Sequence, residues 1–258
     1  MNTNPQFIAL YTLTRRELVR MFRIPAQTFL PPVITTCLYF LIFGAIVGQR
    51  IGLVSGQHYN TFIAPGLVMM SVITNAYTNV ANSLYIVRFQ KSIEEMLVSP
   101  MHWSLLLLGY TLGGVFRGLI VSILVLSVSY FFADINLGHL PETFMVIILV
   151  ATLFSLAGFL NGMLAHTFDE ISFIPTFVLT PLIYLGGVFY TLSMLPPFWQ
   201  QFTNFNPIYY MISALRYAML GQQSDADISI AWIVISTILL ILIITNCILI
   251  KKGIGLRD

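Results

Sequence analysis

A row of polar side chains interrupts an otherwise apolar stretch of the sequence. Its members are four, three, one and three residues apart and therefore share one face of a helix. They are Ser71, Asn75, Thr78, Asn79 and Asn82. Such hydroxyl and amide groups either form hydrogen bonds between helices, worth about 0.6 kcal/mol each in a membrane, or line a polar path for a transported molecule. Both interpretations keep this face away from lipid.

Arg117 is the only charged residue deep inside an apolar segment. Placing an arginine there costs several kcal/mol unless the guanidinium is paired or hydrated. Asp169 and Glu170, in the short connection after the fourth apolar segment, are the nearest acids that could pair with it. Around Arg117 lie glycines whose spacing permits close helix contact, namely Gly109, Gly113, Gly114 and Gly118.

Aromatic side chains supply a second candidate lining. Tyr39 and Phe43 of the first apolar segment are expected to face Tyr184 of the fifth. Lipid contact would explain the same residues, since aromatic residues make up 14% of the chain. The candidates for a translocation path are Tyr39, Phe43, Asn75, Asn79, Asn82 and Tyr184.

The residue types needed for catalysis are not grouped in the sequence. A phosphate-binding loop needs glycines before Lys-Ser, but Lys91 follows Gln90 with no glycine nearby. Two cysteines fall inside apolar segments as buried free thiols, and the histidines lack metal-ligand spacing; these residues are Cys37, Cys247, His58, His102, His139 and His166. We therefore expect no catalytic residue, no metal site and no cofactor in this chain, and no nucleic-acid partner.

Composition predicts an all-α integral membrane protein. Of 258 residues, 57% are hydrophobic and 9% are charged, and the mean hydropathy is +0.86. A soluble domain carries about 25% charged residues. Six apolar segments are long enough to be transmembrane helices, at 27–47, 61–85, 105–132, 143–164, 172–192 and 228–250.

The basic residues predict the orientation. Nine of the 12 lie in the N-terminal segment, the second connection and the C-terminal tail, which an even number of spans places on one side. Arg50 and Arg216 alone lie in the opposite loops. By the positive-inside rule, both termini are cytoplasmic.

Two cytoplasmic segments have the pattern of amphipathic helices. In residues 5–24, the apolar residues share one face and Arg16, Arg20 and Arg23 the other, which predicts a helix in the membrane interface with its arginines facing water or lipid phosphate. In residues 88–100, an apolar side faces a charged one, and Ser99-Pro100 ends the helix. Residues 5–24 are a membrane-surface anchor, a docking surface for a cytoplasmic partner, or both. Residues 88–100 are either a structural turn or a helix that contacts a partner.

Residues 195–221 are apolar and aromatic, but prolines divide them into pieces too short to cross a bilayer. Pro196 and Pro207 suit the first turn of a helix, and Asn206 and Gly221 suit its N-cap and C-cap. The pattern predicts two short re-entrant helices on the extracytoplasmic face. Arg216 could reach lipid headgroups, carbonyls or a neighbouring chain, and a structural lid is favoured over a ligand site.

In this arrangement the chain resembles the ABC-2 type exporter permeases, and most closely their small bacterial inner-membrane members without a large external domain. The resemblance covers essentially the whole chain, as a single membrane domain over 1–258. It rests on Glu94-Glu95-Met96-Leu97-Val98-Ser99-Pro100 after the second span, and on Asn206-Pro207 with Arg216 and Gly221 before the sixth.

The resemblance implies a homodimer of permeases that works in the membrane with two separate ATP-binding subunits, which would hold ATP and Mg²⁺. Residues 5–24 would be the connecting helix and residues 88–100 the coupling helix. The residues that would contact the ATPase are Arg16, Arg20, Arg88, Lys91, Glu94, Glu95 and Met96. The cargo would be an amphipathic or lipid-like molecule moved outward.

Two other functions are open. An ion- or proton-coupled carrier is disfavoured because no acid lies in the middle of a span. A membrane-embedded enzyme acting on lipid-linked substrates is disfavoured because acids and histidines are not clustered.

Overall fold

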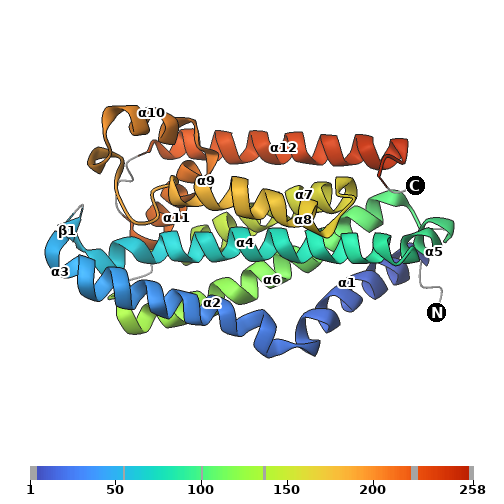
Figure 1. Cartoon of the computed structure of the whole chain (residues 1–258), viewed down its shortest axis with the longest axis horizontal. Coiled ribbons are helices and arrows are strands. Elements are labelled where there is room, and N and C mark those ends of the chain that lie inside the picture. Colours follow the sequence, from blue (N-terminus) through green and yellow to red (C-terminus); the bar gives the residue numbers. More distant parts are fainter. Residues whose placement is uncertain (1–4, 55, 100, 136–137, 222–225, 256–258) are drawn as a thin grey trace.

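The long helices run side by side along the long axis of the molecule (Figure 1). The computed structural model describes residues 5–54, 56–99, 101–135, 138–221 and 226–255. The first half contains α1 (Pro5–Arg23), α2 (Pro25–Tyr39), the π-helical segment η1 (Phe40–Val47), α3 (Gly48–Ile51), β1 (Leu53–Val54), β2 (Gln57–His58), α4 (Tyr59–Phe89), α5 (Ser92–Val98) and α6 (Trp103–Phe132). The second half contains α7 (Leu140–Leu164), α8 (Phe168–Phe173), the π-helical segment η2 (Ile174–Leu179), α9 (Thr180–Tyr184), the short 3₁₀ segment η3 (Leu192–Met194), α10 (Pro197–Phe205), α11 (Pro207–Leu220) and α12 (Ile228–Lys252). Strands β1 and β2 form a small antiparallel pair in which Leu53 lies opposite His58.

Five helical stretches of the described chain are long and apolar enough to cross a membrane. They are Pro25–Ile51 and the helices α4, α6, α7 and α12, and each contains one of the predicted spans at 27–47, 61–85, 105–132, 143–164 and 228–250. Both termini and α5 lie at one end of the bundle, whereas α3, β1 and α10 lie at the other (Figure 1).

The predicted span at 172–192 is wrong at both ends. The helical stretch begins at Phe168 and ends at Tyr184, and the helices α8, η2 and α9 together contain 17 residues. Pro175 and Pro181 each lack a backbone N–H, which weakens regular helical bonding. Gly187, with φ +80, then turns the chain. A helix of this length measures about 25 Å at 1.5 Å per residue, which is slightly less than a bilayer core of about 30 Å.

Helix α4 forms the centre of the bundle. It packs against α6, α7 and α11, and 72% of its most apolar stretch is buried. Two glycines of α7 allow the closest approach: a Cβ at Gly158 would collide with the carbonyl oxygen of Tyr77, and one at Gly162 would lie 2.7 Å from the carbonyl oxygen of Ala81. The backbones of α4 and α7 are therefore in direct contact, as small residues permit in membranes.

We expect Gly158→Ala to destabilise the fold by about 1–3 kcal/mol, the usual cost of overpacking, because the added methyl group meets backbone that cannot rotate away. Gly118→Ala is a graded comparison, since its Cβ would lie 3.1 Å from the Cβ of Ala151, a side-chain atom. Thermal unfolding in detergent, followed by tryptophan fluorescence, measures both. Equal midpoints for the two variants would contradict a backbone contact at Gly158.

The segment at 195–221 forms two short helices, and α11 has the caps that the sequence predicts. The side chain of Asn206 accepts a hydrogen bond from the N–H of Ile208 at 3.0 Å, and Gly221 ends α11 with φ +66. Pro207 occupies the first turn of α11 as expected, whereas Pro196 precedes α10 and Pro197 begins it. Helix α11 is buried against α4, α7 and α12.

Arg216 points into the protein from α11. Its side chain donates to the carbonyl of Gly187 at 2.9 Å, its guanidinium carbon lies 4.0 Å from the ring centroid of Phe62, and the residue is 8% exposed. Arg216 therefore binds a backbone carbonyl, which is one of the partners considered from the sequence. These contacts join α11 to α4 and to the turn after α9.

We expect Arg216→Met to lower the stability by about 1–3 kcal/mol, because a charged hydrogen bond and a cation–π contact are lost together. Arg216→Lys should recover only part of this loss, since an ammonium lacks the planar fork that stacks on Phe62. Thermal unfolding compares both with Arg50→Gln, which removes an exposed charge at the same end. Full recovery by lysine would contradict stacking.

Candidate functional site: the polar network at the end that carries the termini

The segment predicted to be one helix at 88–100 is divided in the structure. Helix α4 continues through Phe89, Lys91 adopts a left-handed conformation with φ 58, and α5 begins at Ser92. The prediction of one continuous helix is thus wrong, because a left-handed residue ends regular helical bonding. Pro100 lies outside the described residues, and α5 ends at Val98.

Helix α5 presents acids outward and an apolar residue inward. Ile93 is 3% exposed and packs in the cluster that contains Leu84 and Leu106, whereas Glu94 and Glu95 are exposed. Phe89, which precedes α5, is 66% exposed and contacts the rings of Tyr85 in α4 and Phe168 in α8. The exposed carboxylates leave one face of α5 available to a partner.

Arg88 closes the end of α7. Its guanidinium donates to the carbonyl oxygens of Gly162 and Ala165, both at 3.0 Å. These carbonyls belong to the last turn and C-cap of α7, where backbone acceptors lack helical partners. The structure therefore shows Arg88 bound within the chain, beside a cavity of about 330 Å³ that Lys91 and Glu94 also line.

Helix α1 packs on α6 through a face that includes an acid. Leu13, Glu17 and Met21 are buried, and Leu13 and Glu17 lie over Gly109 and Gly113. The apolar side chains of Phe7, Tyr11 and Phe22 are exposed. The expectation that the arginine face points to water or lipid phosphate is incomplete for Arg16 and Arg20: their side chains are 37% exposed, but both also bind a buried carboxylate that lies between them.

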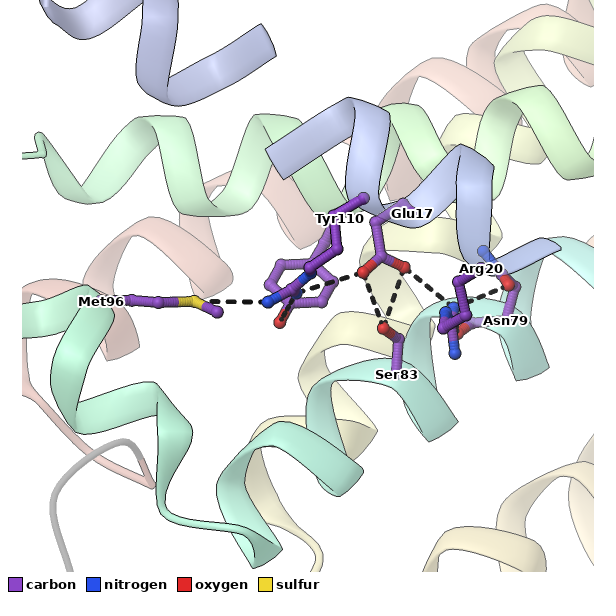
Figure 2. Close-up of polar contacts among 7 residues, drawn as sticks. Glu17, Arg20, Asn79, Ser83, Met96 and Tyr110 are labelled. Carbon is purple, nitrogen blue, oxygen red and sulfur yellow. Dashed lines mark hydrogen bonds and ion pairs between the residues drawn. The ribbon is translucent and has the colours of Figure 1, made fainter. Parts of the chain in front are cut away.

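Glu17 is the centre of this network, as Figure 2 shows. It is 2% exposed, and its two carboxylate oxygens each lie 2.9 Å from the Ser83 hydroxyl. Arg20 donates to it at 2.8 Å and Arg16 at 3.2 Å. Burying a charge this deeply requires pairing of this kind. Glu17 was not among the residues predicted from the sequence; an acid flanked by arginines one and three positions away was the available signal.

Arg16 connects the network to α5 and α6. It donates to the Tyr110 hydroxyl at 2.7 Å, and its Nη1 lies 3.9 Å from the sulfur of Met96 (Figure 2). Burial alone would lower the pKa of Arg16, but Tyr110 and Glu17 outweigh it, so the pKa lies above its usual value. Arg16 therefore stays charged where α1, α5 and α6 meet.

Arg20 and Arg117 extend the network into the bundle through one asparagine. The Asn79 side-chain oxygen accepts from Arg20 at 2.9 Å and from Arg117 at 3.3 Å, and Asn75 accepts from Arg117 at 3.3 Å. The considered pairing of Arg117 with Asp169 or Glu170 is wrong. Arg117 lies midway along α6, whereas Glu170 accepts from the N–H of His166 at the helix end.

The polar residues of α4 therefore lie in two different environments. Asn75 and Asn79 face the arginines, while Asn82 is exposed. Hydrogen bonding between helices, one of the two interpretations of this row, is present at Asn75 and Asn79. Whether the row also lines a path stays a prediction.

The aromatic candidates for a translocation path contact one another, away from the network around Glu17. The hydroxyl oxygens of Tyr39 and Tyr184 lie 2.6 Å apart, which confirms that these residues face each other. Phe43 stacks on Phe189 with ring centroids 4.4 Å apart, and Tyr39 lies 5.2 Å from the same ring. Helix α2 and the turn after α9 are thus joined by aromatic contact.

Comparison with known proteins agrees with this arrangement. The family model described as "ABC-2 type transporter" matches residues 8–220. The chain is 49% identical over 252 residues, covering 98% of both chains, to "Inner membrane transport permease YadH" of Escherichia coli (strain K12), and equally to that of Shigella flexneri. It is 27% identical over 194 residues, 72% of both chains, to "Nodulation protein J" of Rhizobium leguminosarum bv. viciae. These matches confirm the resemblance found in the sequence. The chain belongs to the ABC-2 type transporter family.

Proposed function

We propose that this chain is the permease subunit of an ATP-driven exporter that moves an amphipathic or lipid-like molecule outward across a bacterial inner membrane. The observation that carries the proposal is the continuous polar network from α5, through α1, to the middle of α4 and α6. A partner that displaces α5 would thereby act on the membrane interior. The inner-membrane location follows the name of the relatives from Escherichia coli and Shigella flexneri.

In this proposal ATP and Mg²⁺ belong to a separate ATP-binding subunit, and two such subunits serve a permease homodimer. Contacts with the ATPase are assigned to Glu94 and Glu95, whose side chains are exposed, with Lys91 beside them. Met96, Arg16 and Arg20 lie behind this surface and would transmit its movement, while Arg88 fixes the end of α7. The whole chain, 1–258, acts as one membrane domain.

Both termini are assigned to the cytoplasm, and α10 and α11 to the opposite face, as two re-entrant helices. The distribution of basic residues supports this orientation, and so does the position of both termini and α5 at one end (Figure 1). The helical stretch from Phe168 to Tyr184 would be the sixth span, with the membrane thinned around it. In the dimer, Tyr39, Phe43 and Tyr184 would line the path between the two copies.

Reconstitution tests the proposal. The tagged chain is purified from its native host, and the proteins that copurify are identified; an ATP-binding cassette subunit is expected. The complex is then placed in liposomes containing phosphatidylglycerol with a fluorescent acyl chain. For complexes whose ATPase faces outward, export moves lipid to the inner leaflet, so ATP should raise the fraction protected from dithionite. A falling protected fraction would indicate import, and ATPase activity that is the same without the permease would contradict coupling.

A further inference from the structure

The cavity beside Arg117 has the composition of a site for a negatively charged group. It measures about 220 Å³ and lies between α2, α4 and α6. Its polar lining includes Thr35, Ser71, Thr74, Asn75 and the side chain of Arg117. Drug-sized ligands occupy pockets of about 300–1,000 Å³, so this cavity suits a headgroup rather than a whole amphiphile.

The charge around this cavity is unbalanced. Arg16, Arg20 and Arg117 belong to one network, and the carboxylate of Glu17 is bound by the first two. Among the described residues no carboxylate lies within 4 Å of the Arg117 guanidinium, whose hydrogen bonds to Asn75 and Asn79 are both 3.3 Å long. A charge-assisted hydrogen bond measures about 2.7–2.9 Å. Arg117 is therefore held in place without being neutralised.

An uncompensated arginine at this depth is costly. Arg117 and Asn75 lie midway along α6 and α4, where a charged residue raises the free energy of insertion by about 2.5–3.5 kcal/mol on translocon scales. An anion entering the cavity would remove much of this cost, and a fixed guanidinium is suited to bidentate binding of phosphate or carboxylate. A neutral headgroup would leave this cost unchanged.

We infer that this cavity binds the phosphate or carboxylate of an anionic amphiphile, with Arg117 as its principal cation. The inference rests on the chain being a membrane-spanning permease, as proposed above, but not on the ATPase or the direction of transport. The anion could come from the headgroup of a membrane lipid or from free phosphate.

Native mass spectrometry of the full chain, purified in detergent without any ATPase, tests the inference. Dioleoyl phosphatidylglycerol and dioleoylglycerol, which has the same acyl chains but no phosphate, are titrated separately. We expect tighter binding of phosphatidylglycerol, and a loss of about tenfold or more in Arg117→Gln, the size of a lost charged hydrogen bond. Arg117→Lys should retain only part of the preference, since an ammonium keeps the charge but lacks the planar fork that binds a phosphate bidentately. Competing inorganic phosphate distinguishes the sources: displacement of the lipid indicates a site that accepts free phosphate, and no displacement indicates one that needs the lipid headgroup.

Two further variants keep the test decisive. Asn75→Asp places a carboxylate beside Arg117 with little change in shape, so it should abolish the preference even if Arg117→Gln fails to fold. Arg50→Gln removes an exposed charge distant from the cavity and should leave binding unchanged. Equal binding of the two lipids, an unchanged preference in Asn75→Asp, or an equal loss in Arg50→Gln would overturn the inference.

Discussion

Glu17→Leu should destabilise the protein by about 3–5 kcal/mol, the usual cost of removing one partner from a buried ion pair. The substitution leaves Arg16 and Arg20 facing each other without their shared carboxylate, and it leaves the Ser83 hydroxyl without its acceptor. Glu17→Gln should cost less, because the amide oxygen still accepts a hydrogen bond. Thermal unfolding in detergent measures the order of the three proteins.

Glu142→Leu is the matched control, since Glu142 is an exposed glutamate at the start of α7. Its loss should cost under about 1 kcal/mol, as for an acid near a helix N-terminus. A stability of Glu17→Leu equal to that of Glu142→Leu would show that the ion pairs around Glu17 contribute nothing to the fold. Such a result would also remove the basis for a mechanical link from α1 to α4.

Reversing both acids of α5, with Glu94→Lys and Glu95→Lys, should reduce ATPase stimulation and export at least about tenfold, because like charges at an interface cost several kcal/mol. The two side chains are exposed, so the permease itself should fold normally. The measurements are ATP hydrolysis by the reconstituted complex, copurification of the ATPase subunit, and the unfolding temperature of the permease.

Glu142→Lys provides the comparison, because it reverses one glutamate, half of the charge change, at the opposite end of the bundle. It should leave ATP hydrolysis and copurification unchanged. Wild-type stimulation and export in the double variant of α5 would show that the ATPase docks elsewhere. A loss of equal size in Glu142→Lys would point to a general effect of charge.

Hydropathy was sufficient to predict the five long apolar helical stretches. Local residue chemistry was sufficient to predict the caps of α11. Asn206 and Gly221 act through bonds to neighbours in sequence, so their roles can be predicted without knowing the fold. The contact between Tyr39 and Tyr184 was also predicted, although it joins distant segments. The role of these residues in transport stays a prediction.

The errors arose where tertiary contacts override a local pattern. In α1, the amphipathic pattern favoured arginines that face water or lipid phosphate, but Arg16 and Arg20 also bind the buried carboxylate of Glu17. The partner of Arg117 is an amide from a helix that the charge pattern does not single out. The end of α9 depends on how Gly187 turns the chain, which apolar composition does not reveal.

The glycine contact between α4 and α7 would make these two helices the fixed part of the permease during transport. Backbone against backbone leaves no side-chain layer to slide, so α4 and α7 must move as one body. The helical stretch Pro25–Ile51 is the opposite case, with 11% of its most apolar part buried, and both this stretch and the α8–α9 stretch contain π-helical segments. Such segments bend more easily than regular helix. The swing that opens a path would therefore be carried by α2 and α8–α9 against a fixed α4–α7 pair.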